Sequence, residues 1–263
     1  FFVFKQSTEK PHITEIEKEG NELTQGNAPL VSGASEVFLQ NDQVEISREG
    51  VYRFSWKNGE KTKVESLKIP KEMSIEGSWE IHFMEKPSLG EPMTIKTDSL
   101  QCWTDFEQRQ VKYFSGTARY KKEFTLNRDY TKKGKVYLDL GNVQELATIR
   151  VNGNKVRTCW KAPFRADITE YIKKGDNLLE IDVTNLWPNR LIGDDRQFSQ
   201  DCRWSNGGLA DWPDWARTDA ERPTGRRAFS TWNYYSADSS LLPSGLLGPV
   251  RLTVAVQKEA GTR

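Results

Sequence analysis

Apolar and polar residues alternate along most of this chain with a period of two, which is typical of strands that bury one face. In "VYRFSW", Tyr52, Phe54 and Trp56 fall on one face of a predicted strand. The Asn58-Gly59 pair that follows is typical of a tight hairpin turn between antiparallel strands. We therefore predict a small β-sandwich over residues 1–72, which is either a domain or the end of a larger one.

A second series of alternating segments begins after Pro70, because proline interrupts a strand ladder and a new apolar pattern starts near Ile75. The predicted inward faces comprise Ala118, Tyr120, Phe124 and Leu126; Val136, Leu138 and Leu140; Ala147, Ile149 and Val151; Leu179, Ile181 and Val183; and Leu252, Val254 and Val256. Short strands at this spacing predict a second sandwich, a jelly roll, over residues 73–263. The chain is thus expected to be all-β.

Residues 185–249 interrupt the alternation, and we predict one long loop there. Structureless loops of more than about 15 residues are uncommon in compact domains unless they are functional. This one holds five of the nine tryptophans, so we expect it to pack on the sandwich and not to be disordered. The only helical turn that the pattern favours lies in "DITEYIKKGDN", with Asp167 as a candidate cap and Gly175 as a candidate end.

Charge and motifs exclude several classes of function. The 38 basic and 37 acidic residues give a net charge of +1, which predicts no strong attraction to nucleic acid or to an anionic membrane. No apolar run approaches the roughly 20 residues that a membrane-spanning helix needs. The two histidines, His12 and His82, are far apart, and zinc-ligand spacings, a serine-hydrolase elbow and a phosphate-binding loop are all missing from the sequence.

Carboxylates of the long loop are the remaining candidates for catalysis, because glycosidases use two carboxyl groups about 5 to 9.5 Å apart. The sequence alone does not reveal such a pair. The simpler interpretation is that these carboxylates pair with arginines of the same loop. The carboxylates are Asp194, Asp195, Asp201, Asp211, Asp214, Asp219 and Glu221, and the arginines are Arg190, Arg196, Arg203, Arg217, Arg222, Arg226 and Arg227.

The aromatic residues of the loop suggest carbohydrate binding, because the C–H faces of sugars stack on indole rings while charged side chains take the hydroxyls. We predict a ligand-binding site with Trp187, Arg190 and Asp194 on one side of the loop, and with Trp212 and Trp232 as stacking residues. The alternative is that these tryptophans anchor the loop on the sandwich. No catalytic residue is predicted.

Four stretches carry a resemblance to known families. They are "YFSGTARYKKEFTL", "LDLGNVQELATIRVNGNKV", "WKAPFRADITEYIKKGDNLLEIDVTNLWPNRLIGD" and "STWNYYSADSSLLPSGLLGPVRL". Together, from about Ile75 to Leu252, they resemble the C-terminal region of family 106 glycoside hydrolases, the α-L-rhamnosidases. The middle part is similar to the sugar-binding jelly roll of family 2 glycoside hydrolases. The resemblance implies a galactose-binding-like fold for the second sandwich.

The chemistry of family 106 is expected on a (β/α)₈ barrel assisted by calcium, and this chain lacks the alternation of strands with long helices that a barrel needs. The chain by itself is therefore not expected to turn over substrate. Its first residues, "FFVFKQ", suggest a fragment. The resemblance implies an accessory module, carbohydrate-binding or scaffolding, of an extracellular or periplasmic enzyme that degrades plant or bacterial polysaccharide.

The resemblance also implies partners and a cofactor. The expected partners are carbohydrate and a catalytic domain of the parent chain, and calcium is expected only as a structural ion, with no ligand residues identified. As an alternative, the Trp-rich loop of a purely structural module docks on the catalytic barrel or completes its active site.

Overall fold

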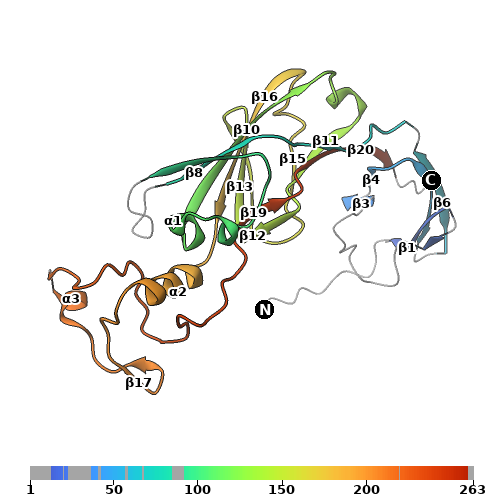
Figure 1. The fold of residues 1–263 in the computed structure, drawn as a ribbon. Helices are drawn as coiled ribbons and strands as arrows, with labels where there is room; N and C mark the ends of the chain where they lie inside the picture. The colour runs from blue at the N-terminus through green and yellow to red at the C-terminus, as the bar shows by residue number, and fades with distance from the viewer. Residues whose placement is uncertain are drawn as a thin grey trace.

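The structure is a computed structural model, and it describes residues 13–19, 21–22, 37–40, 43–56, 59–66, 68–84, 92–218 and 220–259. Within these ranges strands dominate and helices are few and short (Figure 1). The predicted all-β sandwich class is confirmed.

Two antiparallel sheets enclose the main hydrophobic core. The first has the order β14-β13-β16-β10-β8-β9. Its strands are β8 (Trp79–Phe83), β9 (Met93–Thr97), β10 (Thr117–Leu126), β13 (Leu146–Val151), β14 (Asn154–Cys159) and β16 (Gly175–Thr184). The second has the order β15-β11-β20-β4-β3, with β7 also paired to β20. Its strands are β3 (Val37–Gln40), β4 (Gln43–Ile46), β7 (Met73–Ser74), β11 (Lys135–Asp139), β15 (Arg165–Asp167) and β20 (Arg251–Glu259).

The core confirms most of the predicted inward faces, because alternate residues of each strand are buried between the sheets. Phe124 and Val256 are the exceptions, since both are only partly buried. Polar groups in this core are paired: the Tyr120 hydroxyl accepts hydrogen bonds from Trp103 Nε1 at 2.6 Å and from the Leu246 amide at 3.1 Å.

The N-terminal strands form a third sheet with the order β2-β1-β5-β6. These strands are β1 (Ile13–Lys18), β2 (Asn21–Glu22), β5 (Gly50–Trp56) and β6 (Lys61–Ser66). Tyr52, Phe54 and Trp56 lie in its own hydrophobic cluster, and β5 pairs with β6 as predicted, although Asn58 lies outside the described residues. Strand β20 pairs with β11 at its beginning and with β4 at its end, so it runs from one cluster to the other. The domain boundary at residue 72 stays a prediction.

The remaining elements are short. They are η1 (Trp103–Asp105), α1 (Arg109–Lys112), η2 (Thr131–Lys133), α2 (Pro188–Gln197), α3 (Asp214–Arg217), and the paired strands β12 (Asn142–Gln144) with β19 (Gly245–Gly248) and β17 (Trp204–Ser205) with β18 (Gly208–Leu209). In the part of the chain that the structure describes, no helix has the length and apolar character to cross a membrane.

The structure confirms one helical prediction and corrects another. The predicted turn is a single one, in which Ile172 N–H donates to the Ile168 carbonyl at 3.2 Å, and Asp167 caps its start by accepting the Thr169 amide at 3.0 Å. Gly175, with φ of 89°, ends it and begins β16. The prediction that residues 185–249 are a loop throughout is wrong, because α2 lies there.

Candidate functional site

Residues 185–244, which we call the Trp-rich segment, form an outgrowth at one end of the sandwich. Figure 1 shows α2, α3 and β17 in this outgrowth, beside the end of the sandwich that carries α1. Gly193 of α2 packs on the ring of Tyr113 so closely that a Cβ at residue 193 would lie 2.5 Å from a ring carbon. The guanidinium groups of Arg190 and Arg196 lie 5.8 and 6.0 Å from the centre of the same ring. Tyr113 is therefore the point where α2 meets the sandwich.

Two asparagines tie the segment to its own end and to the sandwich. Asn185 donates to the Phe114 carbonyl at 2.8 Å and accepts the Gly116 amide at 2.9 Å. Asn189 donates to the Leu242 carbonyl at 2.7 Å and accepts the Leu242 amide at 2.8 Å. Both side chains are buried, so these hydrogen bonds fix where the segment leaves the sandwich and where it returns.

Asp194 holds the middle of the segment against α2. Its side chain is 0% exposed, and Oδ2 accepts the backbone amides of Arg227 at 2.7 Å and Ala228 at 2.6 Å. Its Oδ1 forms an ion pair with Arg190 Nη2 at 2.9 Å. Burial lowers the pKa of the Arg190 guanidinium, and the neighbouring Asp194 carboxylate opposes that shift. Asp194, paired with Arg190, thus holds the chain around residue 227 against α2.

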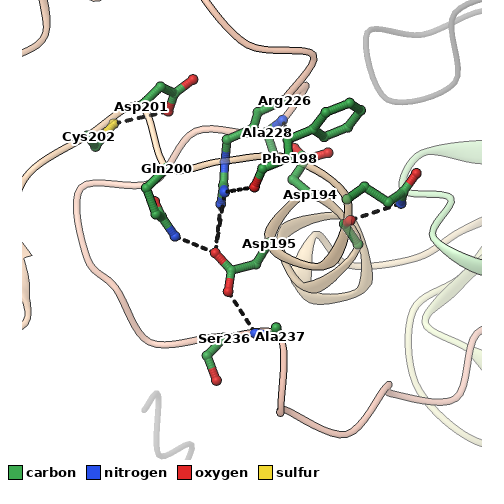
Figure 2. Close-up of polar contacts among 12 residues, drawn as sticks. Asp194, Asp195, Phe198, Gln200, Asp201, Cys202, Arg226, Ala228, Ser236 and Ala237 are labelled. Atoms are coloured by element: carbon green, nitrogen blue, oxygen red, sulfur yellow. Dashed lines mark hydrogen bonds and ion pairs between the residues drawn. The ribbon is translucent and has the colours of Figure 1, made fainter.

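Asp195, the next residue of α2, braces a second part of the segment. Figure 2 shows its carboxylate surrounded by Gln200, Arg226 and Ala237. Oδ1 accepts hydrogen bonds from Arg226 Nη2 at 3.2 Å and from the Gln200 amide, and Oδ2 accepts the Ala237 backbone amide at 2.7 Å. One carboxylate therefore joins α2 to three separate stretches of chain.

Asp201, just after α2, holds a third part of the segment, around residues 222–224. It accepts hydrogen bonds from Arg222 Nε and from Thr224 Oγ1, each at 2.6 Å. Burial alone would raise the pKa of the Asp201 carboxyl, but the hydrogen bonds from Arg222 and Thr224 outweigh burial, and the net pKa is lowered. Arg222 also lies over the ring of Trp215, 4.3 Å from its centre. The interpretation that the loop carboxylates pair with loop arginines is confirmed for Asp194, Asp195 and Asp201.

The three predicted tryptophans all keep about half of their surface exposed. The exposed fractions are 50% for Trp187, 49% for Trp212 and 58% for Trp232. Trp232 packs against the turn of the β17–β18 hairpin, since Cβ atoms at Gly207 and Gly208 would be 3.4 and 3.6 Å from its ring. The indole therefore contacts the backbone of this turn while more than half of it stays exposed.

Two of these tryptophans share a neighbour, Phe229. The ring of Trp212 is 5.7 Å from that of Phe229, and Phe229 lines one shallow pocket together with Trp232 and Tyr235. Trp187 precedes the first turn of α2, and no ring contact among the described residues joins it to the other two. The structure thus gathers Trp212 and Trp232, but not Trp187, around Phe229.

Arg190 and Asp194, the two charged residues of the predicted site, are buried inside the segment. Arg190 and Asp194 are 5% and 0% exposed and bond within the segment, so they present almost no surface to a ligand. Their i,i+4 spacing after Pro188 is typical of a helix, and that signal would have identified α2. Ligand binding by the exposed tryptophans stays a prediction.

Metal binding was expected without identified ligands. Among the described residues, no group of three or more His, Cys, Asp or Glu side chains lies close enough together to hold an ion. Calcium can also bind to carbonyl oxygens, so a calcium site stays a prediction.

The sandwich and its outgrowth match a family of glycoside hydrolase modules: the model "Glycosyl hydrolases family 2, sugar binding domain" covers residues 46–210, and the chain belongs to this family. Among known proteins, a putative beta-glucuronidase from Formosa agariphila is 41% identical over 192 residues, which are 72% of this chain and 16% of that protein. The predicted likeness to family 2 is confirmed.

Two solved structures are also similar to this chain. A rhamnosidase from Novosphingobium sp. PP1Y matches 84% of this chain and 23% of its own, with a TM-score of 0.57 and 25% identity. A Lactobacillus rhamnosus beta-glucuronidase matches 46% of this chain and 22% of its own, with a TM-score of 0.40 and 24% identity. The chain thus spans less than a quarter of the length of these relatives, and membership of family 106 stays a prediction.

Proposed function

We propose that this chain is a non-catalytic, carbohydrate-binding part of a larger glycoside hydrolase, and that it binds sugar with Trp212 and Trp232. The observation that carries the proposal is the geometry of Trp232, whose indole rests on the hairpin turn while 58% of it stays exposed. An indole held in this way can stack on the C–H face of a sugar without first paying for its own ordering. Membership of a family of sugar-binding domains supports the same conclusion.

Calorimetric titration with rhamnose, galactose and a rhamnose-containing oligosaccharide, with and without calcium, tests this proposal. We expect saturable binding that becomes at least about tenfold weaker in Trp212→Ala and Trp232→Ala, a loss of about 1.4 kcal/mol for each. Tyr234→Ala is the matched control, because Tyr234 is 75% exposed but does not line the pocket that Phe229 and Trp232 share. Unchanged affinity in both segment variants would exclude these residues as the site.

The activity of the parent protein is part of the proposal. We propose a polysaccharide-degrading enzyme of the extracellular or periplasmic space, with glucuronidase or rhamnosidase activity, because relatives of both names resemble this chain. Assays of the full-length parent with 4-nitrophenyl β-D-glucuronide and 4-nitrophenyl α-L-rhamnoside separate the two activities, and cell fractionation tests the location. Hydrolysis of neither glycoside would contradict this part of the proposal.

A second function is favoured by one observation. Among the described residues between 198 and 243, only Ala228 is buried, although this stretch is rich in aromatic side chains. Such a surface suits docking on the catalytic domain of the parent, because large exposed apolar patches usually mark interfaces. Under this alternative the purified chain binds the separately purified catalytic domain, Trp212→Ala and Trp232→Ala weaken that complex, and no sugar produces heat.

A further inference from the structure

A second cavity lies on the sandwich itself. It has a volume of about 280 Å³ and is formed by β14, β15 and the loop between them. Figure 1 shows β15 beside β11, on the side of the sandwich away from α2 and α3. Its lining residues that matter here are Glu45, Tyr137, Arg157, Trp160, Lys161 and Arg165. This cavity is therefore separate from the Trp-rich segment.

The rim of the cavity carries an exposed indole on a short, fixed loop. Trp160 is 71% exposed, the largest exposed fraction among the tryptophans that the structure describes as exposed. The loop is anchored at its C-terminal end, because Phe164 is buried in the main core and its carbonyl accepts the Leu140 amide at 2.9 Å. The Lys161 ammonium lies 5.4 Å from the centre of the Trp160 ring. An aromatic face and a cation thus stand together at the opening.

The wall of the cavity is cationic. The Arg165 guanidinium is 8% exposed and lies 3.6 Å from the centre of the Tyr137 ring, which holds it in place. Arg157 lies beside it and donates to the Arg165 carbonyl at 3.4 Å. The one carboxylate of the lining, Glu45, is already compensated, since Lys135 Nζ lies 2.8 Å away and the Tyr137 hydroxyl donates to it. Three cationic side chains therefore face the cavity against one engaged carboxylate.

Other charges near Arg165 do not cancel this excess. Burial lowers the pKa of Arg165 to about 10, so the group stays charged at neutral pH. Asp139 and Asp167 oppose the shift, but neither lines the cavity. Asp139 accepts the Gly141 amide at 2.8 Å, and Asp167 accepts the Thr169 amide at 3.0 Å. Both carboxylates are thus engaged in turns behind the wall.

We propose that this cavity binds one saccharide unit that carries a carboxylate or a sulfate group. The anionic group would lie against the exposed Arg157 and Lys161, because guanidinium and ammonium groups bind such oxygens, and the buried Arg165 would add its positive charge from the wall. The sugar face would stack on Trp160. The volume is close to the lower end of ligand sites, about 300 Å³, which suits a single sugar. The inference rests on the proposed function only in taking carbohydrate as the ligand class.

Calorimetry at pH 7 with matched probes tests this site. D-glucuronic acid is compared with D-glucose, which differs only in the carboxylate, and D-galactose 6-sulfate is compared with inorganic sulfate. We expect glucuronic acid or galactose 6-sulfate to bind at least tenfold more tightly than glucose. Arg157→Gln and Trp160→Ala should each weaken that binding at least fivefold, with unchanged thermal midpoints because both side chains are exposed. Tyr234→Ala is the control and should leave this binding unchanged, because Tyr234 is 75% exposed and lines neither this cavity nor the pocket beside Trp232.

Each other result overturns the inference. Equal affinity for glucose and glucuronic acid, or no binding of any charged probe, excludes an acidic-saccharide site. Equal affinity for inorganic sulfate and galactose 6-sulfate reduces the cavity to a site for small anions. Loss of glucuronic acid binding in Trp232→Ala but not in Arg157→Gln would move the ligand to the Trp-rich segment. Binding of rhamnose or galactose by that segment is measured separately, so the two proposals can fail independently.

Discussion

Replacing Asp194 by asparagine tests how the Trp-rich segment is held. The amide oxygen of asparagine can still accept the Arg227 and Ala228 amides, but its NH₂ group would then face Arg190, which is 5% exposed. Removing one partner of a buried ion pair leaves an uncompensated charge and costs about 3–5 kcal/mol. Because a domain is stable by only about 5–15 kcal/mol, such a loss is large. We expect the segment to lose its order before the sandwich does.

Urea denaturation followed by tryptophan fluorescence measures the loss in the free energy of unfolding of the whole protein. Hydrogen exchange at the Arg227 and Ala228 amides measures the loss of stability in the segment alone. Asp214→Asn is the matched control, since Asp214 pairs with Arg217 at 2.9 Å on the exposed surface. The Asp214→Asn substitution should lower the free energy of unfolding by no more than about 1 kcal/mol. Adding Arg190→Met to Asp194→Asn should recover part of the loss, because it removes the buried charge that Asp194 no longer balances. A loss below about 1 kcal/mol for Asp194→Asn, with unchanged exchange at both amides, would refute the ion-pair argument.

Three further substitutions test other contacts. Gly193→Ala should destabilise the protein by about 1–3 kcal/mol in thermal unfolding, although alanine favours helices, because the new methyl group would meet the ring of Tyr113. Asp201→Asn should lower the thermal midpoint at pH 5–7 but not in strong acid. The pKa of the Asp201 carboxyl in the folded protein is lowered from 3.8. The stability that the carboxylate adds is therefore complete above pH 3.8 and is lost as the pH falls through the folded pKa. Tyr120→Phe should lower the free energy of unfolding by about 2 kcal/mol or more in urea denaturation, since Trp103 Nε1 and a backbone amide lose their common acceptor. For each of the three substitutions, an unfolding midpoint equal to that of the wild type would show that the contact concerned does not stabilise the protein.

The sequence predicted the sandwich because its strands bury alternate side chains, so that each inward face appears as a period of two in residues such as Ala147, Ile149 and Val151. It did not predict α2 because the buried face of that helix is mostly polar. Asn189 and Arg190 are inward residues of α2 and give no apolar periodicity. The local signal for α2 was instead the i,i+4 spacing of Arg190 and Asp194 after Pro188.

The cationic cavity was not predicted for a related reason. Arg157, Lys161 and Arg165 are spread over two strands and a loop, and each alone is an ordinary basic residue. They face one space only because β14 ends beside β15 and the loop between them is pinned by Phe164. The exposed Trp160, between two predicted strands, was the available signal for a site at this edge.

The way in which the Trp-rich segment is anchored bears on what its tryptophans do. If the tryptophans were the anchors, their rings would be buried between the segment and the sandwich. Instead α2 packs on Tyr113 through Gly193, and polar side chains fix the rest of the segment: Asn185 and Asn189 hold the two ends, and Asp194 holds the middle. Trp212 and Trp232 stay half-exposed while these contacts hold the chain. An aromatic ring left in water adds less to stability than a buried one. The exposure of Trp212 and Trp232 therefore favours a role in binding over a role in folding.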